Sequence, residues 1–187
     1  MRRGVLSITA VVGLSLLAAM AWAKEEKEDE AKEHANAKKA VVKAKISLRE
    51  AVEIALKKFP DGKAVEAELE TEDDGIEYEV EVVVGGKHME VEIDPVTGAI
   101  KEVEEEKVDP NDEEEKVEAA AAKATVTLLQ AIDAAQKNVP DGKAFEAEPE
   151  MEDGKLIFEV EFVAGDKIME VEVDATTGKV VEVKEEK

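Results

Sequence analysis

A stretch of this chain occurs twice, and the repeat constrains the fold more than any other feature. Segments 46–107 and 126–187 align without a gap at a constant offset of 80 residues. About half of the aligned positions are identical, including a Pro-Asp-Gly-Lys-Ala run that begins at Pro60 and again at Pro140. The duplication predicts two copies of one small structural unit, joined by the segment 108–125.

Each copy begins with the pattern of a capped amphipathic helix. Ser47 and Glu50 have the spacing of a capping box, in which each side chain satisfies a free backbone N–H group, and Thr127 and Gln130 repeat it. Apolar residues then recur at three- and four-residue spacing, as a helix with one buried face requires. The Pro-Asp-Gly run ends both helices because proline cannot continue one.

The pattern then changes to a period of two residues. Apolar residues alternate with glutamates through 65–70, 76–84 and 89–94, and a last strand is predicted near 99–104. This alternation is typical of antiparallel strands with one buried face. We expect an α+β fold of two tandem repeats, each with one α-helix packed on a short antiparallel β-meander. Pro149 favours an edge position for its strand, because proline cannot donate to a ladder.

Both copies keep an Asp-x-x-Thr-Gly turn before the last strand. Asp94 and Gly98 recur as Asp174 and Gly178. An aspartate at the start of a turn accepts a backbone N–H, and glycine supplies a positive φ. We therefore predict a structural role for these four residues.

The glutamate side of the strands is the candidate partner-binding surface. It is expected to be solvated, which keeps strand edges from aggregating. Like charges on neighbouring strands destabilise one another, and a basic partner or loosely held divalent cations would relieve that repulsion. No calcium-binding loop is recognisable, so only weak divalent cation binding is expected. The acidic face comprises Glu77, Glu79, Glu81, Glu90, Glu92, Glu159, Glu161, Glu170 and Glu172.

The formal net charge of −22 limits the classes of partner. Such a charge repels nucleic acids and anionic membrane surfaces, and it favours basic protein partners. Nucleic acids and membranes are therefore not expected to bind this chain after removal of its leader.

Residues 1–23 have the pattern of a cleaved secretory signal peptide: a basic start, an apolar run and an Ala-Trp-Ala site. An uncleaved anchor is the alternative, since the apolar run is nearly long enough to span a bilayer. Residues 24–45 are charged and are predicted to be either disordered or a loose helix. The acidic and alanine-rich linker 108–125 is either disordered or carries a short exposed helix over 113–123.

Little in the sequence predicts catalysis. The chain has no cysteine, and no serine lies in a nucleophile-elbow motif. His34 lies in the charged segment, and His88 begins a strand at a position where the second copy has Ile168. A surface role is therefore expected for His88. We predict no catalytic residue, no cofactor, no specific metal ligand and no enzymatic activity.

The ordered set of motifs resembles the PepSY domain. The motifs are the capped helix at 47–51, the Tyr/Phe-x-Val-Glu strand at 78–82 and the turn at 93–98, each repeated 80 residues later. The resemblance covers most of 46–107 and 126–187 and neither the leader nor the linker.

PepSY domains occur in the propeptides of secreted metallopeptidases and in bacterial cell-envelope proteins, and are proposed to restrain peptidases. The resemblance implies an exported protein-binding module of the periplasm or cell envelope, with a secreted peptidase or another envelope protein as the expected partner. Because no peptidase domain follows residue 187, action in trans is expected. The alternative function is an acidic cation-binding or cation-responsive envelope protein.

Overall fold

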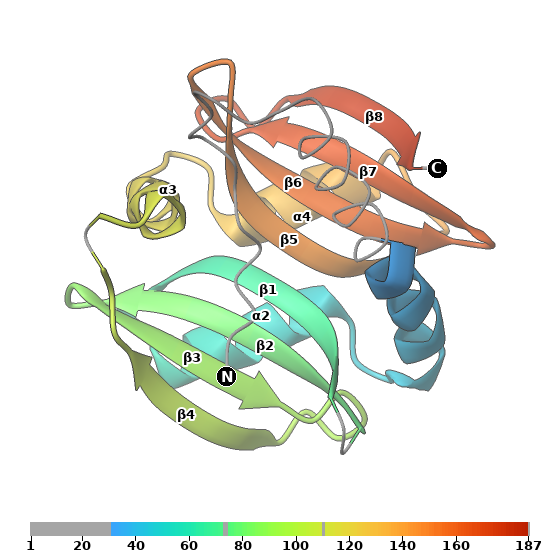
Figure 1. The fold of residues 1–187 in the computed structure, drawn as a ribbon, viewed down its shortest axis with the longest axis horizontal. Helices are drawn as coiled ribbons and strands as arrows, with labels where there is room; N and C mark the ends of the chain where they lie inside the picture. Colours follow the sequence, from blue (N-terminus) through green and yellow to red (C-terminus); the bar gives the residue numbers. More distant parts are fainter. Residues whose placement is uncertain (1–30, 73–74, 110, 187) are drawn as a thin grey trace, which may run out of the picture.

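The computed structural model describes residues 31–72, 75–109 and 111–186, so the predicted signal peptide lies outside the described residues. The described chain folds into helices and strands in an order that repeats once (Figure 1). After a helix over residues 31–43, the elements are α2 (Leu48–Lys58), β1 (Lys63–Glu72), β2 (Gly75–Val84), β3 (Lys87–Ile93), β4 (Ile100–Glu106), α3 (Glu113–Ala121), α4 (Leu128–Gln136), β5 (Lys143–Glu152), β6 (Lys155–Ala164), β7 (Lys167–Asp174) and β8 (Val180–Glu186).

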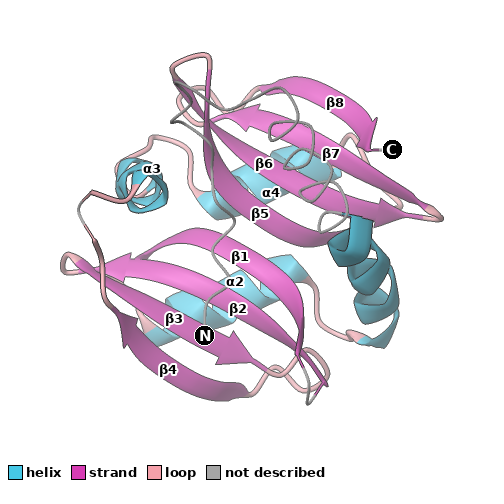
Figure 2. Ribbon diagram, viewed as in Figure 1, coloured by secondary structure: helices cyan, strands magenta, loops and turns pink. Residues whose placement is uncertain are grey.

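The strands form one eight-stranded sheet in the order β4-β3-β2-β1-β5-β6-β7-β8 (Figure 2). Every neighbouring pair is antiparallel, and each repeat contributes a four-stranded meander. The predicted fold class is confirmed. The two meanders are also joined edge to edge, which buries one edge of each repeat.

The junction between the repeats consists of two residue pairs, one of which joins equivalent positions. Ala67 of β1 lies opposite Ala147 of β5, and Glu68 lies opposite Glu146. Residues 67 and 147 differ by the repeat offset of 80, so the two halves meet about a local two-fold axis. Pro149 lies beyond this short pairing. The edge prediction was wrong for β5 as a whole, because β5 is central, but Pro149 itself has no partner residue on β1.

The helix starts are as predicted. In α2 the Glu50 N–H donates to Ser47 Oγ at 3.2 Å, and the Ser47 N–H donates to Glu50 Oε2 at 2.7 Å. In α4 the Gln130 N–H donates to Thr127 Oγ1 at 3.3 Å, and the Thr127 N–H donates to Gln130 Oε1 at 2.9 Å. The local sequence alone therefore sets where both helices begin.

Helices α2 and α4 pack on the apolar face of the sheet (Figure 2). The helices contribute apolar side chains such as Leu48, Val52 and Ile132, and the sheet contributes Tyr78 and Phe158. Equivalent positions of the two repeats thus form one continuous core. The Tyr78 hydroxyl donates to the carbonyl of Ile46 at 2.9 Å, and burial raises the pKa of this phenol.

The other two helices reach the glutamate face, and each contacts the repeat that does not follow it directly. Helix 31–43 precedes the first repeat but packs on the second, where His34 meets the Phe145 ring edge-on with centroids 6.3 Å apart. Lys143 Nζ also donates to the carbonyl of Val41 at 2.7 Å. Helix α3 precedes the second repeat and contacts its strands β5 and β6, yet its glutamates also reach His88 of the first repeat.

These contacts correct two expectations. Segment 31–43 is a packed helix, with Ala37, Ala40 and Val41 buried. Helix α3 is not an exposed helix, because Glu118 is only 1% exposed and Ala121 is buried. Both segments were predicted from charged composition, which does not reveal the apolar surface that covers a short helix after folding.

Candidate functional site

The candidate acidic face forms glutamate rows that cross the sheet from strand to strand. In the first repeat, Glu81 lies between Glu66 on β1 and Glu90 on β3, and Glu104 on β4 extends the row. Equivalent rows run through Glu159 and Glu161 in the second repeat, and the pair of Glu68 and Glu146 joins the halves. Carboxylates that the sequence separates by many residues therefore lie side by side.

The expectation that this face is solvated was wrong for much of it. Of the nine predicted residues, the buried ones are Glu77, Glu81, Glu161, Glu170 and Glu172, and the others are half-buried. The helices on this face and the neighbouring strands shield these carboxylates from water. The face as a whole is therefore a partly covered acidic layer between the sheet and two short helices.

Burial and mutual repulsion raise the pKa of many carboxyls in this layer. Burial, followed by repulsion from Glu70 and Glu66, raises the pKa of Glu68 well above its ordinary value. Burial raises the pKa of Glu159 to about 10 and that of Glu172 to about 7. Several of these groups therefore hold protons near neutral pH, which reduces the repulsion within the rows.

Lysines neutralise some positions at the outer strands. Lys184 Nζ lies 2.6 Å from Glu170 Oε1, and Lys101 forms an ion pair with Glu77. The second repeat replaces the pair of Glu77 and Lys101 with two apolar residues, Ile157 and Val181. Ile157 is buried, whereas Val181 on β8 is 56% exposed.

Four ionisable residues meet in a buried cluster of the first repeat, hereafter the His88 cluster. Glu81 comes from β2, His88 from β3, and Glu115 and Glu118 from α3. His88 Nδ1 contacts Glu81 Oε1, lies 3.0 Å from Glu118 Oε2 and lies 3.4 Å from Glu115 Oε2. Burial and the neighbouring Glu81 raise the pKa of Glu118 to about 10.

The surface role predicted for His88 was therefore wrong, because only 4% of the residue is exposed. The reason is α3, which covers the end of β3 from a distant part of the sequence. The other histidine of the chain is also paired: His34 Nε2 lies 3.3 Å from Glu161 Oε1. Glu81 and Glu161 are equivalent positions, so both histidines lie against the same glutamate of the repeat. Sequence alignment reveals the equivalence of the glutamates but not their partners.

The Asp-x-x-Thr-Gly turns have internal hydrogen bonds. Asp94 Oδ1 accepts the N–H groups of Val96 at 2.9 Å and Thr97 at 2.7 Å, and these bonds lower its pKa. Asp174 is bound in the same way by Thr176 and Thr177. Gly98 and Gly178 have φ of 72° and 69°, values that favour glycine. One carboxylate oxygen of each aspartate, Oδ1, is thus occupied within the turn.

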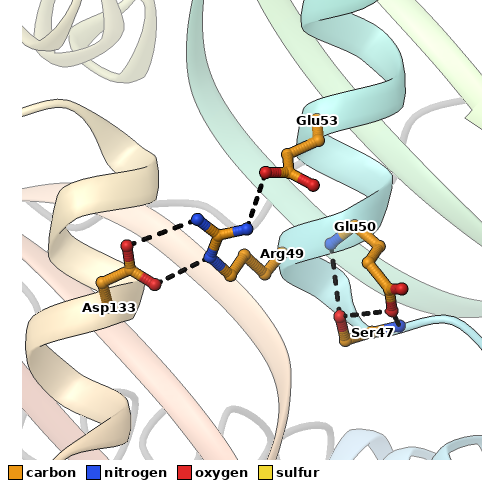
Figure 3. Close-up of polar contacts among 5 residues, drawn as sticks. All are labelled: Ser47, Arg49, Glu50, Glu53 and Asp133. Carbon is orange, nitrogen blue, oxygen red and sulfur yellow. Dashed lines mark hydrogen bonds and ion pairs between the residues drawn. The ribbon is translucent and has the colours of Figure 1, made fainter.

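A cavity of about 290 Å³ opens between helix 31–43, α2 and α4. Its walls include Arg49, Tyr78 and Asp133 and therefore come from both repeats. Arg49 Nε donates to Asp133 Oδ1 at 2.7 Å, and its Nη1 donates to Glu53 at 2.7 Å (Figure 3). These partners raise the pKa of the Arg49 guanidinium, and the bridge links α2 to α4 across the junction.

The outermost strands are the other accessible feature. Strands β4 and β8 end the sheet, so each has one side that no described strand pairs. Most β4 and β8 residues are exposed, including Val181 and Val183 at 56% and 43%. Strand β4 carries Lys101 at the position equivalent to Val181, so β8 has the more apolar edge.

The fold and these surfaces define a tandem-repeat α+β protein with an acidic layer and two free sheet edges. The chain belongs to the PepSY family, the peptidase propeptide and YPEB domain, whose model matches residues 45–104 and 125–184. A comparison with curated proteins gives no match.

Two solved structures are similar to the chain. CD1622 of Clostridium difficile 630 is 24% identical, with 76% of this chain and 95% of that chain covered and a TM-score of 0.45. The Bacillus megaterium YpeB C-terminal domain is 14% identical, with 78% and 67% covered and a TM-score of 0.29. Among the described residues, no helix has the length and apolar character needed to cross a membrane.

Proposed function

We propose that this chain is an exported, non-enzymatic PepSY module that binds a partner protein and restrains a peptidase in trans in the periplasm or cell envelope. PepSY domains are protein-interacting modules, which supports the general role. The signal-peptide pattern of residues 1–23 supports export. The specific mode of binding rests on the edge of β8.

The edge of β8 suits an extended segment of the partner. A free strand edge offers unpaired backbone groups, and an added strand gains main-chain hydrogen bonds from them. Val181 and Val183 supply exposed apolar contacts beside that edge. The neighbouring acidic side chains, such as the exposed Glu182 and Glu185, favour a segment that carries Lys or Arg.

The proposal is tested with the chain 24–187 and a panel of purified secreted metallopeptidases. Binding and peptide hydrolysis are measured for the unaltered chain and for Val181→Lys. This variant introduces the residue that the first repeat carries at the equivalent position, so it is expected to fold normally. We expect inhibition by the unaltered chain and a clear loss of inhibition with Val181→Lys, because lysine on an edge strand discourages strand addition.

The reciprocal variant Lys101→Val is the matched control. It removes the ion pair of Lys101 with Glu77 in the first repeat but leaves β8 unaltered, so the β8 interaction is expected to be unchanged, and urea unfolding checks that the variant is folded. Inhibition that survives Val181→Lys in full would contradict the role of β8. Failure of the unaltered chain to bind any peptidase in the panel would count against the peptidase target itself.

A further inference from the structure

The His88 cluster contains more acceptors than donors. Three carboxylates and one imidazole place a ligand atom each within 4.8 Å of one another. All three carboxylates approach the same nitrogen, His88 Nδ1. A single ring N–H can serve only one or two of them, even when the imidazole is protonated.

Glu118 is the least satisfied member of the cluster. Its residue is 1% exposed, and neither carboxylate oxygen has a hydrogen-bond partner of good geometry among the described residues. A buried carboxylate without hydrogen bonds is costly unless a cation or a proton compensates it. The side chain nevertheless points toward His88, with Oε2 at 3.0 Å from Nδ1.

The second repeat shows that the fold does not need this cluster. At the positions equivalent to His88, Glu115 and Glu118 the chain has Ile168, Ala35 and Lys38. Only the counterpart of Glu81, which is Glu161, is kept. The second repeat does have an imidazole against this glutamate, from His34, but it has no carboxylate at the positions of Glu115 and Glu118, so these two ligands are particular to the first repeat.

We propose that Glu81, His88, Glu115 and Glu118 bind one divalent transition-metal cation of the Zn²⁺ or Mn²⁺ class. An imidazole nitrogen together with carboxylate oxygens is a ligand set for these metals. Ca²⁺ takes six to eight oxygen ligands, and Mg²⁺ usually keeps several waters, so neither suits this compact, buried set as well. Glu115 is the most accessible ligand, with a side-chain exposure of 13%, and marks the side from which the ion enters.

The bound ion would join α3 to the sheet. Two ligands come from α3 and two from the β2–β3 hairpin, so coordination stabilises the contact between the linker helix and the first repeat. This inference does not depend on the edge of β8 or on any peptidase.

The test is calorimetric titration of the chain 24–187 with Zn²⁺ and, separately, Mn²⁺ at moderate salt. We expect one equivalent of Zn²⁺ to bind with little dependence on salt. His88→Ile and Glu118→Gln should each weaken binding by about 100-fold or more, since even outer-shell changes typically cost 10- to 100-fold. His34→Ala is the matched control, because it removes the histidine at the equivalent glutamate, and it should leave binding unchanged.

Histidine NMR gives a second measurement, made on the unaltered chain, and His34→Ala serves only to assign the signals. The chain has two histidines, so their ring signals are readily distinguished with His34→Ala. Mn²⁺ should broaden the His88 signals selectively, and Zn²⁺ should shift its ring nitrogens. Binding that is lost with salt, or that persists unchanged in His88→Ile, would overturn the proposal. Absence of binding by both ions would also overturn it and would indicate a proton shared between Glu118 and Glu81.

Discussion

Ala67 on β1 lies directly opposite Ala147 on β5, so the two repeats meet through their own equivalent positions. A junction of this kind is self-complementary, as in an isologous dimer. The chain thus resembles a dimer whose two subunits have been joined by the linker that contains α3.

This relationship predicts how a single repeat behaves. A fragment of residues 111–186 exposes the β5 edge and removes the contacts of α3 with the first repeat, whereas its contacts with β5 and β6 remain. We expect the fragment to form a symmetric dimer in which Ala147 of each copy lies opposite the other, because one repeat alone is marginal in size. Light scattering would measure the mass. A stably folded monomer would contradict the prediction, and Ala147→Lys serves as the dimer-breaking control.

The bridge between Arg49 and Asp133 is expected to contribute modestly to stability. Arg49→Leu introduces the residue found at the equivalent position 129 of the second repeat. Because the pair is largely solvent-exposed, we expect a loss of about 0.5 kcal/mol in the free energy of unfolding, and a smaller loss at high salt. Urea unfolding at two salt concentrations measures the loss in the free energy of unfolding and its dependence on salt. Glu53→Gln is the control for the contact within α2, and a loss that does not depend on salt would point to packing instead.

Gly62 is predicted to be intolerant of any side chain. A Cβ at this position would lie 2.4 Å from Val82 Cγ1, and one at the equivalent Gly142 would lie 2.5 Å from Val139 Cγ1. Gly62→Ala should therefore destabilise the protein by about 1–3 kcal/mol through overpacking. Thermal or urea unfolding measures the loss. In the double variant with Val82→Ala, the loss of stability should be smaller than the sum of the two single losses, because the shorter side chain removes part of the clash. Strict additivity would contradict the steric explanation.

Stability should fall as the pH rises through the neutral range. Glu159 and Glu172 have folded-state pKa values of about 10 and about 7, above the ordinary value of 4.5. Between 4.5 and these values the folded state binds more protons than the unfolded state, so deprotonation favours unfolding. Each such carboxyl contributes at most about 1.4 kcal/mol per pH unit.

Melting temperatures are accordingly expected to be higher near about pH 5 than near about pH 8. Glu159→Gln should flatten this dependence, because the amide remains neutral throughout. Asp94 and Asp174 have lowered pKa values, so their protonation destabilises the folded state. This loss of stability should begin only as the pH falls below the ordinary value of 3.8. A melting temperature that rises from acidic to alkaline pH would contradict the prediction.

The local elements were predictable because their signals are close together in sequence. The capping pair of Ser47 and Glu50 is three residues apart, and the alternation through β2 and β3 assigns each side chain to one face of the sheet. The candidate site was less predictable. The alternation placed Glu81 on the glutamate face, but whether that face meets water depends on elements distant in sequence.

The sequence by itself determined the duplication, the helix starts, the strand periodicity and the α+β class, since these depend on local hydrogen bonding and on the spacing of apolar residues. Tertiary structure alone decided that Ala67 meets Ala147, that helix 31–43 packs on the second repeat while α3 contacts both repeats, and that His88 is buried among Glu81, Glu115 and Glu118. The physical reason is that burial and charge pairing depend on which surfaces pack together after the chain has folded, and a repeating pattern shows which face a residue occupies without showing what covers it.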